Sequence, residues 1–334
     1  MTATTPTTAA ITTPERIVDI AIGYMGAKQL FAASRIGLFA AIADGARTVD
    51  EIAAATSVTP RMARILSDAM ASLGLLNRRD GRYELTADAA AYLSGANAEL
   101  DLGPFLAFLN EVSYGHWLQF DATVDTTEPG ELGMDEGRWA TFMAGVMTYN
   151  ELHASMLARH FDFSPYRDAL DLGGLSPAFA IEGMKANPEL STRFVFAPDF
   201  TASVEEAVAQ AGLGDRAIVE GAETETAAPG GEHDLVLVNH VIHRFDDAQN
   251  RVILANARAA ARTGARLVLL DFFLDDDARQ RSIDALHAGE YLVIDGTVVY
   301  PESTVREWLA GTGWKPVDKV ALPGSPRILI AEAV

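Results

Sequence analysis

The segment Asp168–Leu190, DALDLGGLSPAFAIEGMKANPEL, decides how the second half of this chain folds. It starts as an apolar run that contains Asp171 and ends at Gly173-Gly174, the pattern of a strand that turns into a helix at a nucleotide-binding loop. A further glycine is expected next, but the chain continues with Leu175-Ser176-Pro177. The segment therefore predicts the first strand and helix of an open parallel sheet, with a loop whose cofactor chemistry is altered.

Short apolar segments alternate with helical patterns after Ala169. They read ALDLGG, RFVFAP, AIVEG, DLVLVNHV and RLVLLDFFL, and two later ones read PVDKVAL and RILIAEAV. Continuous runs of Val, Leu and Ile indicate strands buried on both faces, as in a parallel sheet covered by helices. The last two segments are joined by PGSP and are expected to pair antiparallel at one edge. Residues 165–334 are therefore predicted to form a Rossmann-like α/β domain.

Residues 14–99 have the pattern of an α-helical winged-helix domain. Thr48 and Glu51 have the spacing of a capping box at the start of one helix. Thr59 precedes a proline and is the expected N-cap of the next helix. A hairpin is predicted around Asp80-Gly81. Helix, helix and hairpin in this order make up a winged helix.

A winged helix suggests either nucleic-acid binding or subunit packing. The candidate recognition helix and wing carry Arg61, Arg64, Arg78, Arg79 and Arg82. The formal net charge of −20 opposes a phosphate backbone, so we expect no nucleic-acid partner. The segment Ile17–Ile42 reads as a helix that is apolar on many faces, which suits burial against another subunit. We therefore expect a homodimer built on this helix.

Composition excludes several classes of protein. The chain has 334 residues and no cysteine, which excludes disulfides, thiolate metal sites and a cysteine nucleophile. No run is apolar and long enough to span a membrane, so no membrane partner is expected. Residues 1–13 are rich in Thr and Ala and read as a disordered tail rather than a signal peptide. We expect a cytoplasmic protein.

Residues 100–164 are predicted to form a helical connector rich in aromatic residues and methionine. Because the connector directly precedes the α/β domain, it is in a position to line a substrate pocket. A plain helical core fits the same spacing equally well. The candidate pocket residues in this connector are Phe105, Phe108, Trp117, Trp139, Phe142, Met143 and Met147.

The order of these parts, from about Glu15 to Val334, resembles the S-adenosylmethionine-dependent O-methyltransferases of natural-product pathways. The most specific match is HVIHRFDDAQNRVILANARAAARTGARLVLLD, where that family has a His-Asp-Trp run, a helix, a glycine turn and a fifth strand. The resemblance implies a class I methyltransferase fold and a homodimer. It also implies a small aromatic or polyketide-like substrate and a histidine base, here His243.

The same resemblance implies an S-adenosylmethionine site, from which this chain departs in three places. Leu175 and Pro177 replace glycines, Ala197 replaces the acid that grips the ribose, and Ala222 replaces the aspartate that holds the adenine. Each lost polar contact costs about 1–3 kcal/mol. Three losses would weaken binding by several powers of ten, so we expect no firmly bound cofactor. The residues that remain as candidate cofactor contacts are Asp171, Gly173, Gly174, Asp199, Gly221 and Asn239.

Two histidines follow the fourth predicted strand. His240 and His243 are three residues apart and would share a face if a helix began there. A histidine at the carboxyl end of a strand suits general-base catalysis, which we assign to His243. His240 is a pocket candidate, although a buried histidine satisfied by the backbone is the preferred interpretation.

Two charged residues are further catalytic candidates. Arg244 replaces the family's aspartate and could stabilise a developing anion, or could be an exposed arginine. Glu302 matches the family's late glutamate that orients the histidine, but an acid at a helix N-terminus fits as well.

A metal site is the weaker interpretation of the histidines. His240, His243, His287 and Glu290 could supply ligands, but their spacing is not specific, and we expect no metal. His287 and Glu290 remain pocket candidates, since the resemblance implies that their helix lies over the substrate.

The sequence thus predicts an enzyme of secondary metabolism that acts on a small natural-product intermediate. The damaged cofactor loop favours a reaction without a methyl donor, such as cyclisation, rearrangement, elimination or hydration. The alternative is ordinary S-adenosylmethionine-dependent O-methylation with a rebuilt cofactor site. A third hypothesis is a non-catalytic partner or ligand-binding regulator.

Overall fold

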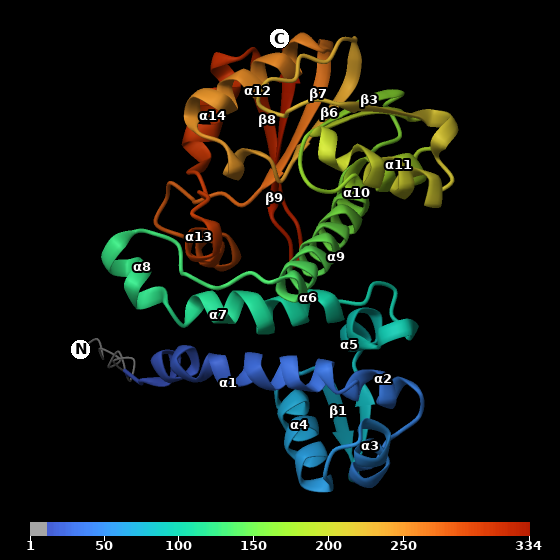
Figure 1. Cartoon of the computed structure of the whole chain (residues 1–334), viewed down its shortest axis with the longest axis vertical. Coiled ribbons are helices and arrows are strands. Elements are labelled where there is room, and N and C mark those ends of the chain that lie inside the picture. Colours follow the sequence, from blue (N-terminus) through green and yellow to red (C-terminus); the bar gives the residue numbers. More distant parts are fainter. Residues whose placement is uncertain (1–11) are drawn as a thin grey trace, which may run out of the picture. The chain divides into compact units, whose positions relative to one another are not determined.

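The computed structural model describes residues 12–334 and divides into two compact units, residues up to Asn110 and residues from Glu111 onward (Figure 1). The predicted connector, residues 100–164, is shared between these units. Of the predicted tail, residues 1–13, all but the last two lie outside the described residues.

The first unit has the predicted order of helices and hairpin. Helices α3 and α4 precede the two-stranded hairpin, which is the winged-helix arrangement. Its elements are α1 (Glu15–Arg35), α2 (Leu38–Ala43), α3 (Val49–Thr56), α4 (Pro60–Ser72), β1 (Leu76–Arg79), β2 (Arg82–Leu85), α5 (Ala87–Leu93) and α6 (Gly103–Phe108).

Local sequence signals explain where these elements begin and turn. Thr48 and Glu51 form the predicted capping box of α3. The Thr59 side chain accepts a hydrogen bond from the Met62 backbone at the start of α4. Asp80 and Gly81 both have positive φ, 50° and 72°, which lets a two-residue turn join β1 to β2. These predictions are confirmed.

The predicted single helix over Ile17–Ile42 is wrong, because the structure has two helices there. Helix α1 ends at Arg35, and α2 begins after Gly37, whose φ of 72° lies in the left-handed region and breaks the helix. The apolar side chains of α2 are buried in the core of the unit. On α1, Ile17 and Ile20 are 73% and 67% exposed, so this helix carries an apolar surface that a single chain leaves uncovered.

The second unit alternates strands and helices after three leading helices. Those leading helices are α7 (Tyr114–Trp117), α8 (Phe120–Thr126) and α9 (Glu136–His160). The α/β part consists of β3 (Asp168–Leu172), α10 (Ala178–Ala186), β4 (Ser191–Phe196), α11 (Thr201–Gln210), β5 (Ala217–Gly221), β6 (His233–Asn239), α12 (Asp247–Ala259), β7 (Ala261–Asp271), α13 (Ser282–Asp295), α14 (Glu302–Gly311), β8 (Trp314–Ala321) and β9 (Arg327–Ala333).

In the described residues these strands form a seven-stranded sheet in the order β5-β4-β3-β6-β7-β9-β8. The strands from β5 to β7 pair in parallel, and β9 runs antiparallel to both β7 and β8. Parallel pairing and a terminal antiparallel hairpin were predicted and are confirmed. The strand order reverses between β3 and β6, and in such sheets the carboxyl ends at the reversal bind ligands.

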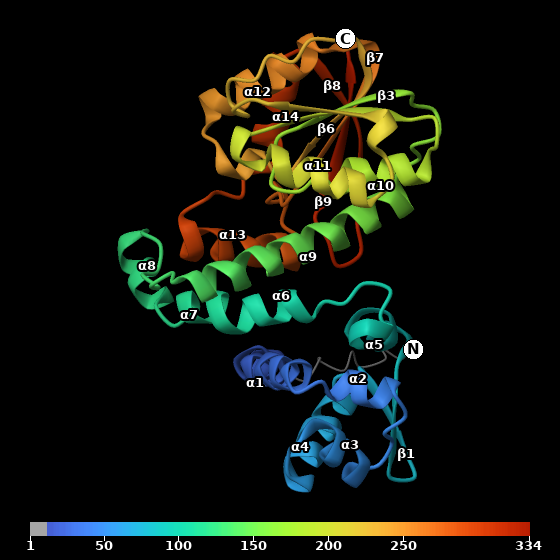
Figure 2. The same cartoon turned by 45° about the vertical axis from the view of Figure 1, so that its right-hand side comes forward.

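Helices cover both faces of the sheet, with α12 and α14 on one side and α10 and α11 on the other (Figure 2). The central strand β6 is buried along its whole length, which explains its continuous apolar run. Val236 and Val238 of β6 pack in one core cluster with Ile253 of α12 and Trp308 of α14. None of the described helices is long and apolar enough to cross a membrane.

Candidate active site

The turn after β3 has the backbone conformation of a cofactor loop. Gly173 and Gly174 have φ of 80° and 88°, values that favour glycine. A Cβ atom at Gly174 would lie 2.9 Å from the backbone oxygen of Asn239, and one at Gly173 would lie 2.4 Å from Thr224 Cγ2. Packing inside the chain therefore requires both glycines, so their presence is not by itself evidence of a bound cofactor.

Two buried polar atoms at the strand reversal have no hydrogen-bond partner in the structure. They are Oδ2 of Asp171 in β3 and Nδ2 of Asn239 at the end of β6. Burial raises the pKa of Asp171 well above its ordinary value. Leaving such a group unsatisfied costs about 1–3 kcal/mol, so this place suits a polar ligand group or an ordered water. These two polar atoms fit the polar amino-acid end of S-adenosylmethionine.

The ends of β4 and β5 do not supply the carboxylates that the resemblance implies. Asp199 is exposed in the short helix η3 (Pro198–Phe200) after β4. Pro198 Cα lies 3.5 Å from the position that a Cβ atom would take at Gly221. Ala222 packs against the hydrophobic core. The chain thus has buried polar groups at the strand reversal, and alanines at the two positions where the resemblance implies acids for the ribose and the adenine.

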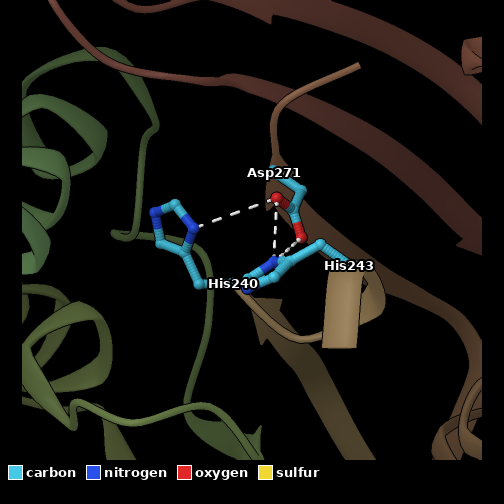
Figure 3. A group of neighbouring side chains, drawn as sticks. All are labelled: His240, His243 and Asp271. Atoms are coloured by element: carbon cyan, nitrogen blue, oxygen red, sulfur yellow. Dashed lines mark hydrogen bonds and ion pairs between the residues drawn. The ribbon is translucent and has the colours of Figure 1, made fainter. Parts of the chain in front are cut away.

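A histidine–aspartate pair lies at the ends of β6 and β7 (Figure 3). His243, in the short helix η5 (Ile242–Arg244), places Nδ1 2.9 Å from Oδ2 and 3.2 Å from Oδ1 of Asp271. Asp271 is fully buried, which raises its pKa, but His243, His240 and the Phe272 N–H outweigh burial and bring the pKa below its ordinary value.

An ionised Asp271 fixes the tautomer of His243. The carboxylate accepts a hydrogen bond only from a protonated Nδ1, so the neutral imidazole of His243 has its lone pair on Nε2. An imidazole in this state is a general base whose orientation is set by the buried acid.

Glu302 does not contact this histidine, so the prediction that it orients His243 is corrected. Its buried carboxylate lies 2.7 Å from Arg306, 2.7 Å from Lys319 and 3.7 Å from Arg327. The acid beside the histidine is Asp271, which the sequence places at the ligand-binding edge without assigning it a role. The reason is geometric, because β6 and β7 are parallel neighbours and their carboxyl ends share one edge.

His240 lies in a left-handed turn of the backbone and not in a helix. Its φ is 52°, and α12 begins only at Asp247, so the expectation that His240 and His243 share a helix face is wrong. Nδ1 of His240 lies 3.9 Å from Asp271 Oδ1, and its Nε2 lies 2.8 Å from Nδ1 of His153 in α9. Burial lowers the pKa of His240 to about 4 and that of His153 well below its ordinary value.

Aromatic and imidazole rings surround the two histidines. The His287 ring stacks on Phe272 with centroids 3.8 Å apart, and its Nδ1 lies 2.7 Å from the Ile283 backbone oxygen. Burial lowers the pKa of His287 to about 4. The rings nearest to His240 are those of His153, Phe179 and Phe272, and Tyr291 packs against His243. Tyr149 and His287 pack behind them, against His153 and Phe272 respectively. The site is thus mostly apolar, with imidazole rings around one buried carboxylate.

Glu290 and Trp117 contact each other. The indole N–H of Trp117 donates to Glu290 Oε2. Burial raises the pKa of Glu290 above its ordinary value. Trp117 also packs against Gly289, where a Cβ atom would meet the ring at 2.9 Å. These contacts join α7 to α13.

The remaining predicted pocket residues lie on α6 and α9. Trp139 stacks on Phe142 with centroids 5.3 Å apart, and Trp139 is 54% exposed. Met143 and Met147 are half-buried on the same helix, α9. Phe105 and Phe108 belong to α6 of the first unit, with ring centroids 6.3 Å apart. Their role in a pocket stays a prediction.

Arg244 is exposed, and its guanidinium lies 5.7 Å from the ring centroid of its neighbour Phe245. The acids whose charges act on it are Glu225 and Asp295. A catalytic role for Arg244 therefore stays a prediction.

The structure brings only two of the four metal-binding candidates together among the described residues. Within the described residues His240, His243 and Asp271 have possible ligand atoms within 4.8 Å of one another. His287 and Glu290 are not part of this group and bond elsewhere. The direct contact between His243 and Asp271 accounts for the geometry as a hydrogen bond.

Sheet order, strand reversal and the polar groups at the strand ends together define a class I methyltransferase fold. Residues 115–315 match the model of the O-methyltransferase domain, and residues 18–95 match that of the O-methyltransferase dimerisation domain. The chain therefore belongs to the O-methyltransferase family of natural-product biosynthesis.

Curated relatives and solved structures agree with this assignment. The chain is 32% identical to 3-hydroxy-5-methyl-1-naphthoate 3-O-methyltransferase of Streptomyces sahachiroi, over 95% of this chain and 94% of the relative. It is 27% identical to O-demethylpuromycin-O-methyltransferase of Streptomyces alboniger, over 96% of this chain and 88% of the relative. The fold matches the S-adenosylmethionine-dependent methyltransferase SibL in its apo form, with a TM-score of 0.83 and 23% identity over 96% and 99% of the two chains.

Proposed function

We propose that this chain is an enzyme of secondary metabolism that methylates a hydroxyl group of a small aromatic or polyketide-like molecule. The observation that carries the proposal is the contact of 2.9 Å between His243 Nδ1 and the buried Asp271. The name of one relative supports it, because 3-hydroxy-5-methyl-1-naphthoate 3-O-methyltransferase of Streptomyces sahachiroi is named for the methylation of a hydroxyl group. The comparisons favour methylation over the reaction without a methyl donor that the sequence favoured.

His243 would act as the general base. A substrate hydroxyl that donates a hydrogen bond to Nε2 loses its proton to this nitrogen as the oxygen becomes nucleophilic. The imidazolium that forms is stabilised by the carboxylate of Asp271 on the other side of the ring. General-base assistance of this kind contributes roughly 10²–10⁴-fold to rate. The surrounding rings exclude water and offer apolar contact to an aromatic substrate.

S-adenosylmethionine, when bound, supplies an electrophilic methyl group to the activated oxygen. Asp171, Gly173, Gly174 and Asn239 are the residues that would hold its polar end. Leu175, Pro177 and Ala222 stand where the family resemblance implies other contacts, so the cofactor would be held in a rebuilt site.

A second candidate function uses the same base without a methyl donor. It is favoured by the replaced loop residues and by the absence of carboxylates at Ala197 and Ala222, at the ends of β4 and β5. Removal of a proton from a hydroxyl or an acidic carbon by His243 would then start a cyclisation, rearrangement or elimination.

Calorimetric titration of the full-length chain with S-adenosylmethionine and its demethylated product separates the two functions. Dissociation constants in the micromolar range or tighter support methyl transfer. No heat change with either compound at millimolar concentration would contradict methyl transfer and favour the second candidate. A matched control is the Gly174→Val variant, which cannot keep the loop conformation and should abolish any specific heat change.

We also propose that the working enzyme is a homodimer. The apolar surface of α1, with Ile17, Ile20 and Tyr24 exposed, and the match to a dimerisation domain support this. Light scattering at micromolar concentration should give twice the mass of the chain, and Ile20→Glu should lower it. A monomeric wild type would contradict the proposal.

A further inference from the structure

Asp271 faces two imidazoles rather than one. His243 takes Oδ2 at 2.9 Å, while Oδ1 accepts from the Phe272 N–H at 2.9 Å and has Nδ1 of His240 at 3.9 Å (Figure 3). On its far side His240 places Nε2 2.8 Å from Nδ1 of His153. Both histidines are buried, and His153 is completely so. The base described above uses neither of them.

The charges and distances dictate the tautomers of this chain of side chains. An unprotonated Nδ1 on His240 would turn its lone pair toward an ionised carboxylate, so the proton of His240 belongs on Nδ1. Nε2 of His240 is then an acceptor. Because two lone pairs at 2.8 Å would repel, Nδ1 of His153 must be the donor.

We propose that His153 and His240 are positioning residues for the base. The N–H group of His153 points to His240, and the N–H group of His240 points to Oδ1 of Asp271. This arrangement keeps the carboxylate negative and leaves Oδ2 to accept the hydrogen bond from His243. His243 is thereby held as the Nδ1–H tautomer, with the Nε2 lone pair available to the substrate. The inference rests on the proposed role of His243 as base and holds with or without a methyl donor.

The backbone of His240 supports a role beyond packing. A residue other than glycine with a φ of 52° is strained, and such strain persists where the surroundings require one conformation. The left-handed turn brings the imidazole over Asp271 and against His153, which an extended backbone would not do. Other titratable groups that act on this pair are His243, His287 and Tyr149.

The test is nitrogen NMR of the full-length enzyme with ¹⁵N-labelled histidine, which needs neither substrate nor cofactor. At pH 7 we expect neutral His153 and His240 with the proton on Nδ1, and His243 with a proton on the Nδ1 that faces Asp271. In His240→Gly, which accepts the same φ without strain, the His243 signals should shift from one tautomer toward a mixture. His240→Asn, which also tolerates this φ and can donate to Asp271, should keep His243 in one tautomer.

His153→Phe keeps a ring and removes the donor, so His240 should then show both tautomers. The three variants His240→Asn, His240→Gly and His153→Phe ensure that one misfolded variant does not decide the result.

Two NMR outcomes would overturn the proposal. One is wild-type His240 as the Nε2–H tautomer, and the other is an unchanged His243 signal in the folded His240→Gly protein. Stoichiometric metal bound to the purified enzyme would overturn it too, because the imidazoles would then be ligands. Since calorimetry with the cofactor tests the methyl transfer separately, the two failures are distinguishable.

Discussion

The carboxyl edge of the sheet has two unlike halves. At the ends of β6 and β7, His243 contacts Asp271 at 2.9 Å and rings close around the pair. At the ends of β4 and β5, the chain has Ala197 and Ala222 where the family resemblance implies carboxylates. The ends of β6 and β7, which we call the base half, thus bring a histidine and a carboxylate together. The ends of β4 and β5, which we call the cofactor half, keep the fold of a cofactor site without these two acids.

This difference shows that a preserved motif and a preserved function are separate observations. Gly173 and Gly174 would survive the loss of a cofactor, since Thr224 and the Asn239 backbone occupy the space that a Cβ atom would need. Packing does not in the same way require a histidine beside a buried, ionised aspartate, because burying a charge without a functional reason is costly. The base half is accordingly the stronger evidence of function.

The largest expected effect is on the base half. His243→Asn should lower turnover by roughly 10²–10⁴-fold, because the amide restores a hydrogen bond but not a base. Asp271→Asn should act in the same direction, since it removes the charge that fixes the tautomer. His160→Asn, an exposed histidine at the end of α9, is the matched control. Steady-state kinetics on the true substrate measure the effect, and full activity in His243→Asn would move the catalytic role to another group.

The same half should make stability depend on pH. His240 and His287 have pKa values of about 4 in the folded chain and an ordinary value of 6.5 when unfolded. Between these values the unfolded chain binds more protons, so stability is greatest above pH 6.5 and falls as the pH decreases toward 4. These two groups together predict a loss of about 3 kcal/mol between pH 6.5 and pH 5, and the buried His153, whose pKa is also lowered, adds to this loss.

Urea unfolding at pH 7, 6 and 5 measures this loss. His287→Phe keeps the stacking on Phe272 and should remove about half of the loss that His240 and His287 contribute together. A flat profile in the wild type would mean that these imidazoles are hydrated in solution and that the base half is open to water.

The cofactor half offers a gain-of-function test. Ala222→Asp restores the acid that the family resemblance implies for the adenine, and it should tighten S-adenosylmethionine by about 1–3 kcal/mol, or roughly 5- to 150-fold. Ala228→Asp, an exposed site further along the same loop, is the control for added charge. Calorimetry measures the change. Equal affinity in wild type and Ala222→Asp would show that the rebuilt site binds the adenine by other contacts.

The smallest effect is expected from Arg244→Ala. Because the side chain is exposed and lies over Phe245, its removal should change turnover less than about threefold. A fall comparable to that of His243→Asn would instead place a cation at the developing anion, and would extend the base half by one residue.

Much of the fold could be predicted from the sequence, because local signals determine it. The capping box at Thr48, the turn at Asp80-Gly81 and the buried run of β6 each mark their own element. The break at Gly37 could not be predicted from glycine alone, because Gly23 and Gly26 lie inside α1 without ending it.

The candidate site could be predicted only in part. His243 follows a strand and was found, but its partner depended on which strand lies beside β6. His153 is 87 residues from His240, so no local pattern connects them. The left-handed backbone of His240 has no signal either, because the residue is neither glycine nor asparagine.

The strained turn at His240 lowers the stability of the fold while it positions a side chain that we propose supports catalysis. Glycine accepts a φ of 52° without cost, so a glycine at this position would relieve the backbone while removing the imidazole. Laboratory evolution for heat resistance would therefore accumulate this substitution unless catalysis were selected at the same time. A thermostable line that keeps histidine at position 240 under a purely thermal screen would show that the ring contributes more to folding than its backbone conformation costs.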